Sequence, residues 1–159
     1  MKLKLYKPKP ILSKFVIETI DGQLLYTIKR RSFLIRGSWV VYDISESKIA
    51  NIAICFSLLV PKAKVTIAGG EKYYIKRKLS FENNYEIDGS LWKTDCSMYA
   101  HNIAILDESD RPIISASKVN GSWHNEYTLN VHQEDYLVRA LCLIFAINAL
   151  TALMRKNNN

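Results

Sequence analysis

The sequence is poor in the residues that mark several classes of protein. It has 3 Cys, 4 Pro and 6 Gly in 159 residues, which excludes a disulfide-rich scaffold, a collagen-like chain and a Pro/Gly-rich low-complexity chain. Hydrophobic residues make up 48% of the chain and charged residues 23%, a balance that is not typical of a disordered basic tail. The length predicts a single domain, which we place at residues 1–156, followed by a polar tail at 157–159.

The start of the chain lacks the apolar core of a signal peptide. Residues 1–14 contain five Lys and two Pro, without an apolar run of roughly 7–15 residues. The three cysteines, Cys55, Cys96 and Cys142, stand at wide spacings and form no CxxC pair. These features predict a cytoplasmic protein, either free or peripheral to the membrane.

Motifs for catalysis, metals and cofactors are missing as well. No GxSxG, P-loop or GxGxxG motif occurs, and the three histidines have neither HxH nor HExxH spacing. Asp107, Glu108 and Asp110 gather in a predicted turn, but the spacing and closing Glu of an EF-hand are absent, so we interpret them as a solvated turn. The sequence therefore predicts a non-enzymatic protein with no catalytic residue, metal or cofactor. A Cys–His pair assembled by the fold stays open at this point.

Most of the chain alternates between apolar and polar residues. Tyr73 and Ile75, for example, alternate with Lys72 and Lys76, which is typical of a strand with one buried face in an antiparallel sheet. Gly-containing and Asn-containing pairs separate such runs, at 21–22, 69–70, 83–84, 88–89 and 120–121. The runs predict about twelve strands, near 3–7, 14–20, 23–31, 38–44, 48–58, 63–68, 72–81, 84–88, 91–98, 101–107, 111–119 and 124–131.

The last part of the chain holds the one long hydrophobic run. Residues 134–154 contain no Gly or Pro and are apolar around every face of a helix that would be about 31 Å long. Glu134 and Asp135 at the start, and Arg155 and Lys156 after the end, suit the helix dipole. A helix that is hydrophobic all round is either buried in a core or crosses a membrane.

These two alternatives give different proteins. In one, residues 137–154 anchor a tail-anchored membrane protein, a reading that Arg139 and Asn148 oppose because polar side chains are costly in hydrocarbon. In the other, the strands close into a barrel, which encloses more space than its own side chains readily fill, and the helix fills it. We favour the second: a mainly β protein in which a closed antiparallel barrel of about twelve strands encloses a central C-terminal helix.

The order of these segments resembles the LURP-one-related family of the Tubby C-terminal-like superfamily, in the form of a bacterial-type member. The residues that carry the resemblance are four pairs of segments, at 15–22 with 25–29, 41–44 with 49–52, 105–107 with 111–118, and 127–131 with 139–148. The position of Asn148 is often Asp in relatives, so the chain departs from the family there. The resemblance implies a twelve-stranded barrel threaded by the C-terminal helix. Tubby-like domains bind phosphoinositide headgroups through basic side chains, and phospholipid scramblases are thought to share the fold.

Positive charge is concentrated in the first half of the chain. Residues 1–78 hold 16 Lys/Arg and 5 Asp/Glu, whereas residues 79–159 hold 6 and 10. Two basic runs end predicted strands, with one further Arg near the first, and their cations suit phosphate groups. The candidate ligand-binding residues are Lys29, Arg30, Arg31, Arg36, Lys76, Arg77 and Lys78. Solvated strand ends are the plainer interpretation of the same residues.

The sequence thus predicts binding of anionic phospholipid headgroups or an anionic membrane surface. Nucleic acid is not expected as a partner, because no RNP pattern, recognition-helix signature or zinc module is present. The alternatives are the tail-anchored protein described above and a module that binds another protein.

Overall fold

The computed structural model describes residues 1–9, 14–31, 37–55, 60–78, 84–97, 101–119 and 126–157. These residues form twelve strands and a long helix, with a short 3₁₀ turn, η2 (Glu134–Tyr136), just before the helix. Each strand overlaps one of the twelve predicted segments. The elements are β1 (Lys2–Tyr6), β2 (Lys14–Thr19), β3 (Leu24–Arg30), β4 (Ser38–Tyr42), β5 (Lys48–Cys55), β6 (Lys62–Ile67), β7 (Lys72–Arg77), β8 (Tyr85–Asp88), β9 (Lys93–Cys96), β10 (Asn102–Leu106), β11 (Pro112–Lys118), β12 (Tyr127–Val131) and α1 (Leu137–Asn157).

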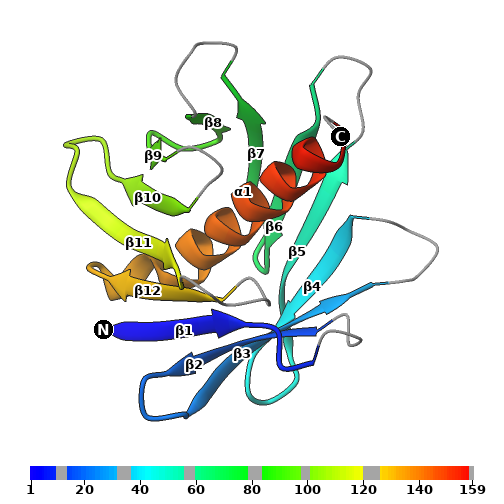
Figure 1. Cartoon of the computed structure of the whole chain (residues 1–159), viewed down its shortest axis with the longest axis vertical. Helices are drawn as coiled ribbons and strands as arrows, with labels where there is room; N and C mark the ends of the chain where they lie inside the picture. Colours follow the sequence, from blue (N-terminus) through cyan, green and yellow to red (C-terminus); the bar gives the residue numbers. More distant parts are fainter. Residues whose placement is uncertain are drawn as a thin grey trace.

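The strands form one antiparallel sheet that curls around α1 (Figure 1). Its order is β8-β7-β6-β5-β4-β3-β2-β1-β12-β11-β10-β9, so consecutive strands are neighbours and the first strand joins the last. Within the described residues, β8 and β9 at the two ends of this order share no backbone ladder. Their contact is made instead by Thr94 of β9, whose Oγ1 accepts from the backbone N of Tyr85 and donates to its carbonyl, both at 2.8 Å. The predicted barrel is confirmed, with a seam that a side chain bridges.

Alternation along each strand separates an inward from an outward side. Leu3 and Leu5 of β1 are buried and pair with Leu129 and Tyr127 of β12, which are also buried. The polar residues between them face outward. Because paired residues lie on the same side of a sheet, this register assigns a side to every strand residue away from the bulges.

Helix α1 supplies the centre of the core. All residues from Ala140 to Ile147 are buried, so this part of the helix has no solvent face. Phe145 makes edge-to-face contacts with Phe15 of β2 and Trp39 of β4, at centroid distances of 5.1 and 5.4 Å. A barrel of this strand number leaves an interior that needs filling, and the apolar helix fills it.

The ends of the helix differ in detail from the prediction. Residues 134–136 form the 3₁₀ turn η2, so α1 begins at Leu137, and it continues to Asn157 rather than ending at 154. Arg139 near its start pairs with Glu71, and the Tyr136 ring packs edge-on against Trp92 at 5.2 Å. By length and composition alone the segment 134–155 is suited to cross a membrane, but in the structure the helix lies inside the barrel.

The two ends of the barrel are built differently. At the turn end, where even-numbered strands finish and α1 begins, four hairpins share one five-residue geometry, at 19–23, 43–47, 67–71 and 107–111. Their fourth residue has positive φ, at Gly22, Glu46, Gly70 and Asp110. At the mouth end, odd-numbered strands and α1 finish. The predicted turns at 83–84 and 120–121 fall partly or wholly outside the described residues.

The acidic turn at 107–110 is solvated in part: Glu108 and Asp110 are exposed as predicted, whereas Asp107 is buried. Asp107 is 7% exposed, and its Oδ1 accepts from the backbone N of Ser109 and Arg111 at 2.9 and 3.0 Å. Its Oδ2 accepts from Arg111 Nε at 3.0 Å. Burial acts to raise the pKa of Asp107, but these donors outweigh it and hold the pKa below its usual value. The carboxylate therefore organises the turn.

Candidate functional site

The structure brings both predicted basic runs to the mouth end of the barrel. Strands β3 and β7 run in the same direction, because an odd number of strands lies between them and each strand is antiparallel to the next. Residues 29–31 and 76–78 thus finish at the same end as α1, with β4, β5 and β6 between them. Arg36, the seventh predicted residue, lies outside the described residues.

Some of these cations face outward and are partly neutralised. Lys76 pairs with Glu86 of β8, Nζ to Oε2, at 2.9 Å. Lys29 lies 5.0 Å from the centre of the Tyr42 ring and 3.9 Å from Glu46 Oε1. Arg31 and Lys78 are exposed just beyond their strands. Exposed ion pairs contribute little to stability, so these side chains keep their capacity to meet an anionic surface.

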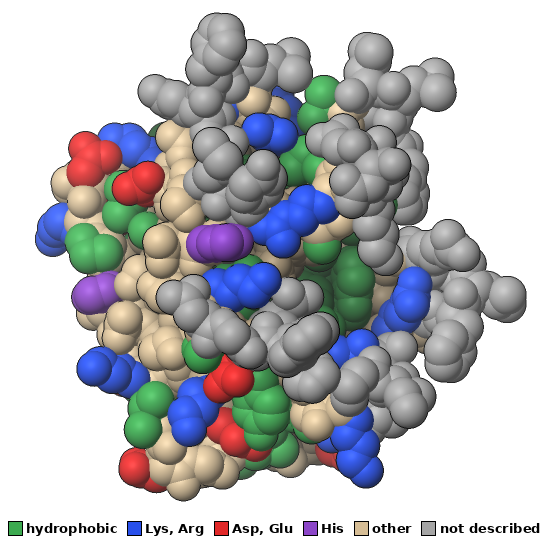
Figure 2. Space-filling model, in the orientation of Figure 1, with side chains coloured by type: hydrophobic (Ala, Val, Ile, Leu, Met, Phe, Trp, Pro, Cys, Tyr) green, Lys and Arg blue, Asp and Glu red, His purple; other side chains and the backbone are tan. Residues whose placement is uncertain are grey.

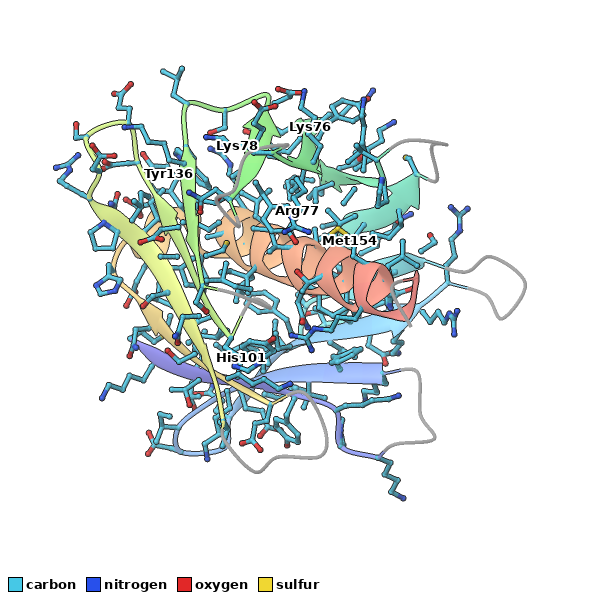
Figure 3. All side chains as sticks on the ribbon, turned by 45° about the horizontal axis from the view of Figure 1, so that its top comes forward. Lys76, Arg77, Lys78, His101, Tyr136 and Met154 are labelled. Atoms are coloured by element: carbon cyan, nitrogen blue, oxygen red, sulfur yellow. The ribbon has the colours of Figure 1, made fainter. Side chains whose placement is uncertain are left out.

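Two arginines of the same runs lie on the inward side. Arg30 is paired in register with Trp39, whose ring packs on α1. Its Nε is buried without a hydrogen-bond partner in the part of the chain that the structure describes. Arg77 is paired with the buried Tyr85, and its Nη1 lies 3.9 Å from Sδ of Met154 on α1. Figure 3 shows Arg77 beside Met154 at the helix, with Lys76 and Lys78 farther from it. The candidate residues therefore do not form one site.

Three further cationic or titratable residues at the mouth end were not predicted as site residues. Lys118 of β11 is paired with the buried Tyr127, which places it on the inward side. The backbone N of Lys118 donates to the carbonyl of His101 at 2.7 Å, so His101 lies at the same end (Figure 3). Arg155 lies on the last turns of α1.

Two buried tyrosines near the mouth end form hydrogen bonds to α1. The Tyr127 hydroxyl donates to Asn148 Oδ1 at 3.0 Å. The Tyr85 hydroxyl lies 2.7 Å from Thr151 Oγ1, and because Thr151 donates to the carbonyl of Ile147 at 2.9 Å, Tyr85 is the donor. Residues 148, 151 and 155 share one face of the helix, so Arg155 lies one turn beyond Thr151.

Burial and positive charge act in opposite directions on the pKa of both tyrosines. Burial raises the pKa of Tyr85, while its bond to Thr151 and the positive charges of Arg77 and Arg155 act in the opposite direction. Burial likewise raises the pKa of Tyr127, opposed by the charge of Arg155.

The barrel is charged oppositely at its two ends. Cations at the mouth end of the described chain are Lys7, Lys9, Lys14, Lys29, Arg30, Arg31, Lys62, Lys76, Arg77, Lys78, Lys118 and Arg155. The mouth end also holds Glu86, Asp95 and Glu126. Acidic residues outnumber cations at the turn end, where Asp21, Asp43, Glu46, Glu71, Asp88, Asp107, Glu108, Asp110, Glu134 and Asp135 lie together with Lys2, Lys48, Lys72, Lys93, Arg111 and Arg139. Figure 2 shows a face with Lys, Arg and one His side chains near its centre. Such a distribution attracts anions to one end of the molecule.

The described residues offer little for a metal or for thiol chemistry. In the ranges that the structure covers, no three His, Cys, Asp or Glu side chains gather in an arrangement suited to a metal ion. Burial raises the pKa of both the Cys96 and the Cys142 thiol to about 12, so neither is a reactive thiolate at neutral pH. A cleft at the turn end, lined by Trp92, Tyr136 and Glu108 among others, carries no cluster of this kind.

The fold defines a class of protein: a twelve-stranded Tubby-like barrel around one C-terminal helix. The sequence profile of the LURP-one-related family matches residues 3–148, and the chain belongs to this family. An X-ray structure of a protein from Arabidopsis thaliana is similar, with 15% identity and a TM-score of 0.63 over 91% of this chain and 89% of that one. At this identity the likeness concerns the fold alone. No curated protein sequence matches.

Proposed function

We propose that this domain is a non-enzymatic module that binds anionic phospholipid headgroups at a membrane surface through the mouth end of its barrel. The single observation that carries the proposal is the uneven charge along the barrel, with an excess of cations at the mouth end and an excess of acidic residues at the turn end. A cation near an anionic leaflet contributes about 1 kcal/mol of attraction. The opposite charge at the turn end orients the mouth end toward the membrane.

The proposal places the domain in the cytoplasm, peripheral to an anionic leaflet. In its support, all three cysteines are free, and Cys55 is exposed. The burial of α1 in the barrel supports attachment by surface charge, since the apolar helix is already used as core.

Sedimentation with phosphatidylcholine vesicles that carry phosphatidylserine tests this function. Wild-type protein is expected to bind, and to be released as salt concentration rises, because the attraction is screened. The double variant Arg31→Glu/Lys78→Glu is expected to bind about thirtyfold more weakly or worse, from at least about 2 kcal/mol of lost attraction.

A matched control changes the net charge by the same amount at the other end. The variant Lys48→Glu/Lys72→Glu alters two exposed cations at the turn end. It is expected to bind within about threefold of wild type if orientation matters. Equal losses in the two variants would show that only net charge acts, and no binding to any anionic vesicle would refute the proposed function.

A further inference from the structure

Exposed apolar side chains gather at the turn end of the barrel. Of the large hydrophobic residues that are exposed in the described part of the chain, only Tyr74 lies elsewhere, on β7. The others lie in turn-end connections, at the start of β1 or β3, or on η2, and they are Met1, Ile20, Leu24, Ile44, Leu91 and Tyr136. Leu91 and Ile44 are 74% and 67% exposed. Exposed apolar side chains that gather in one region, rather than lying scattered, are typical of an interaction surface.

Two clefts lie at the turn end, and η2 contributes residues to both. The apolar lining of the first is Leu91, Trp92 and Tyr136, and that of the second is Tyr26, Ile67, Leu137 and Val138. Each cleft has a volume of about 310 Å³, close to the smallest volume that is typical of ligand sites. The Tyr136 ring lies between them, since it packs on Trp92 of the first cleft and lies 5.9 Å from the guanidinium carbon of Arg139 in the second. A partner's side chains can therefore enter two adjacent recesses.

Each cleft contains an arginine that is paired with a carboxylate of the same cleft. Arg111 Nε lies 3.0 Å from Asp107 Oδ2 in the first, and Arg139 pairs with Glu71 in the second. The lining carboxylates that take part in no ion pair within the described residues are Glu108, Glu134 and Asp135. The last two suit the dipole at the helix start, whereas Glu108 belongs to the hairpin at 107–111. The clefts therefore favour a partner that brings cations.

Lysine and arginine side chains suit both the apolar and the acidic lining of the clefts. Their methylene stems pack on apolar and aromatic surface, and their charged ends reach carboxylates or the faces of rings. Exposed side chains of this kind stand at the mouth end of the same chain, as Lys9, Arg31, Lys62 and Lys78. The mouth end of one copy therefore complements the turn end of another, both in charge and in the kind of side chain that it offers.

We infer that the turn end of one copy docks on the mouth end of a second copy, so that the barrels associate head to tail. A contact between two different surfaces of the same protein leaves one free surface of each kind, so it builds chains of copies rather than stopping at a dimer. The net charge of +7 opposes association, and we expect it to be weak, with a dissociation constant of roughly 10 μM to 1 mM. This contact does not require a membrane, but an anionic membrane competes for the same mouth end.

Sedimentation velocity of the full-length protein measures this association. The average mass of wild type is expected to rise above that of one chain between about 10 μM and about 1 mM, and to pass that of two chains. Leu91→Ser/Glu108→Gln removes one apolar and one acidic side chain from the first cleft, and Arg31→Gln/Lys78→Gln removes two cations from the mouth end. Each variant alone is expected to associate about tenfold or more weakly, from at least about 1.4 kcal/mol of lost contact energy.

A mixture of the two variants tests whether unlike ends meet. The turn-end variant keeps its mouth end and the mouth-end variant keeps its turn end, so one intact contact remains between them. An equimolar mixture is expected to form dimers and no longer chains. The substitutions neutralise charge rather than reverse it, so that the two altered ends gain no attraction for each other.

A matched control alters one cation and one exposed ring away from both ends. In Lys64→Gln/Tyr74→Ser the exchanged residues are neighbours on the outward side of β6 and β7, with Lys64 Nζ 5.7 Å from the centre of the Tyr74 ring. This variant is expected to associate within about twofold of wild type. Urea unfolding of every variant checks that the barrel is intact; the exchanged residues at the two ends are exposed, so little change in stability is expected there.

Several results refute the head-to-tail contact. If wild type stays monomeric up to about 1 mM, the turn end serves a different protein or none. Association that stops at two chains shows that like ends meet. A mixture that stays monomeric while wild type associates, or an equal loss in the control variant, shows that the contact lies elsewhere. The membrane function is judged separately: a protein that associates but binds no anionic vesicle supports this contact and refutes that function, and a monomer that binds vesicles does the reverse.

Discussion

Replacement of Phe145 by Ala tests whether α1 is the core of the barrel. Phe145 is 2% exposed, and its ring meets those of Phe15 and Trp39 edge to face. Removal of a buried Phe side chain costs about 3–5 kcal/mol through lost apolar burial and the cavity that remains. The two ring contacts account for about 1–3 kcal/mol of this cost. Against a total stability of about 5–15 kcal/mol, the variant stays folded but is strongly weakened.

Urea unfolding followed by tryptophan fluorescence measures the effect. With an m-value of about 2 kcal/mol/M, a loss of about 4 kcal/mol lowers the unfolding midpoint by about 2 M. Phe145→Leu keeps most of the apolar volume and loses the ring contacts, so its midpoint is expected to fall by about half as much. The exposed Ala152 on the same helix provides the control, since Ala152→Ser is expected to change stability by less than about 0.5 kcal/mol.

One result would refute this reasoning. If Phe145→Ala and Ala152→Ser both leave the midpoint unchanged, the barrel does not depend on the helix for its core. The same result, combined with a need for detergent to keep the full chain in solution, would instead favour the tail-anchored alternative.

Three further predictions concern other parts of the barrel. Thr94→Val removes both hydrogen bonds to the Tyr85 backbone at the β8–β9 seam. Because two buried backbone groups lose their partner, the free energy of unfolding in urea is expected to fall by about 2–4 kcal/mol. An unchanged free energy of unfolding would mean that the seam does not need this bridge. A thiol reagent on native protein is expected to modify Cys55 quickly, and Cys142 only after unfolding; fast reaction of Cys142 would contradict its burial. Because the pKa of Asp107 is lowered in the folded state, this carboxylate stabilises the protein above about pH 4, the unfolded pKa, and the stabilisation is lost as pH falls through the folded pKa. Asp107→Asn is therefore expected to lose less stability in acid than wild type does. If the stability of the variant falls with pH as that of wild type does, this carboxylate is not the source of the loss.

Sequence periodicity predicted the fold well because a barrel repeats one simple pattern. All twelve strands came from the alternation of apolar and polar residues, and the Gly at 22 and 70 marked hairpins correctly. The equivalent hairpins at 43–47 and 107–111 lack the glycine signal because Glu46 and Asp110 hold the positive-φ position, so they were expected only from the strands on either side and, at 107–110, from a run of acidic residues. Their signal lies at the first residue, where an Asp carboxylate accepts from backbone N–H groups two and four residues on.

The candidate site was predicted less well, for a physical reason. Runs of Lys and Arg show where positive charge lies along the chain, but adjacent residues of a strand point to opposite sides of the sheet. Lys76 and Arg77 are neighbours in sequence, yet one pairs with Glu86 outside and the other meets Met154 inside. Lys118 is the last residue of the alternating run in β11, so its inward side could have been predicted by counting two residues on from Ala116.

The inward placement of Arg77 and Lys118 follows from the same alternation that builds the core. Along β7, Tyr73 and Ile75 precede Arg77 on the inward side, and along β11 Ile114 and Ala116 precede Lys118. A cation there loses hydration and gains little from a helix end that supplies about half a charge. On both strands the inward side thus passes from apolar core residues to a cation at the mouth end.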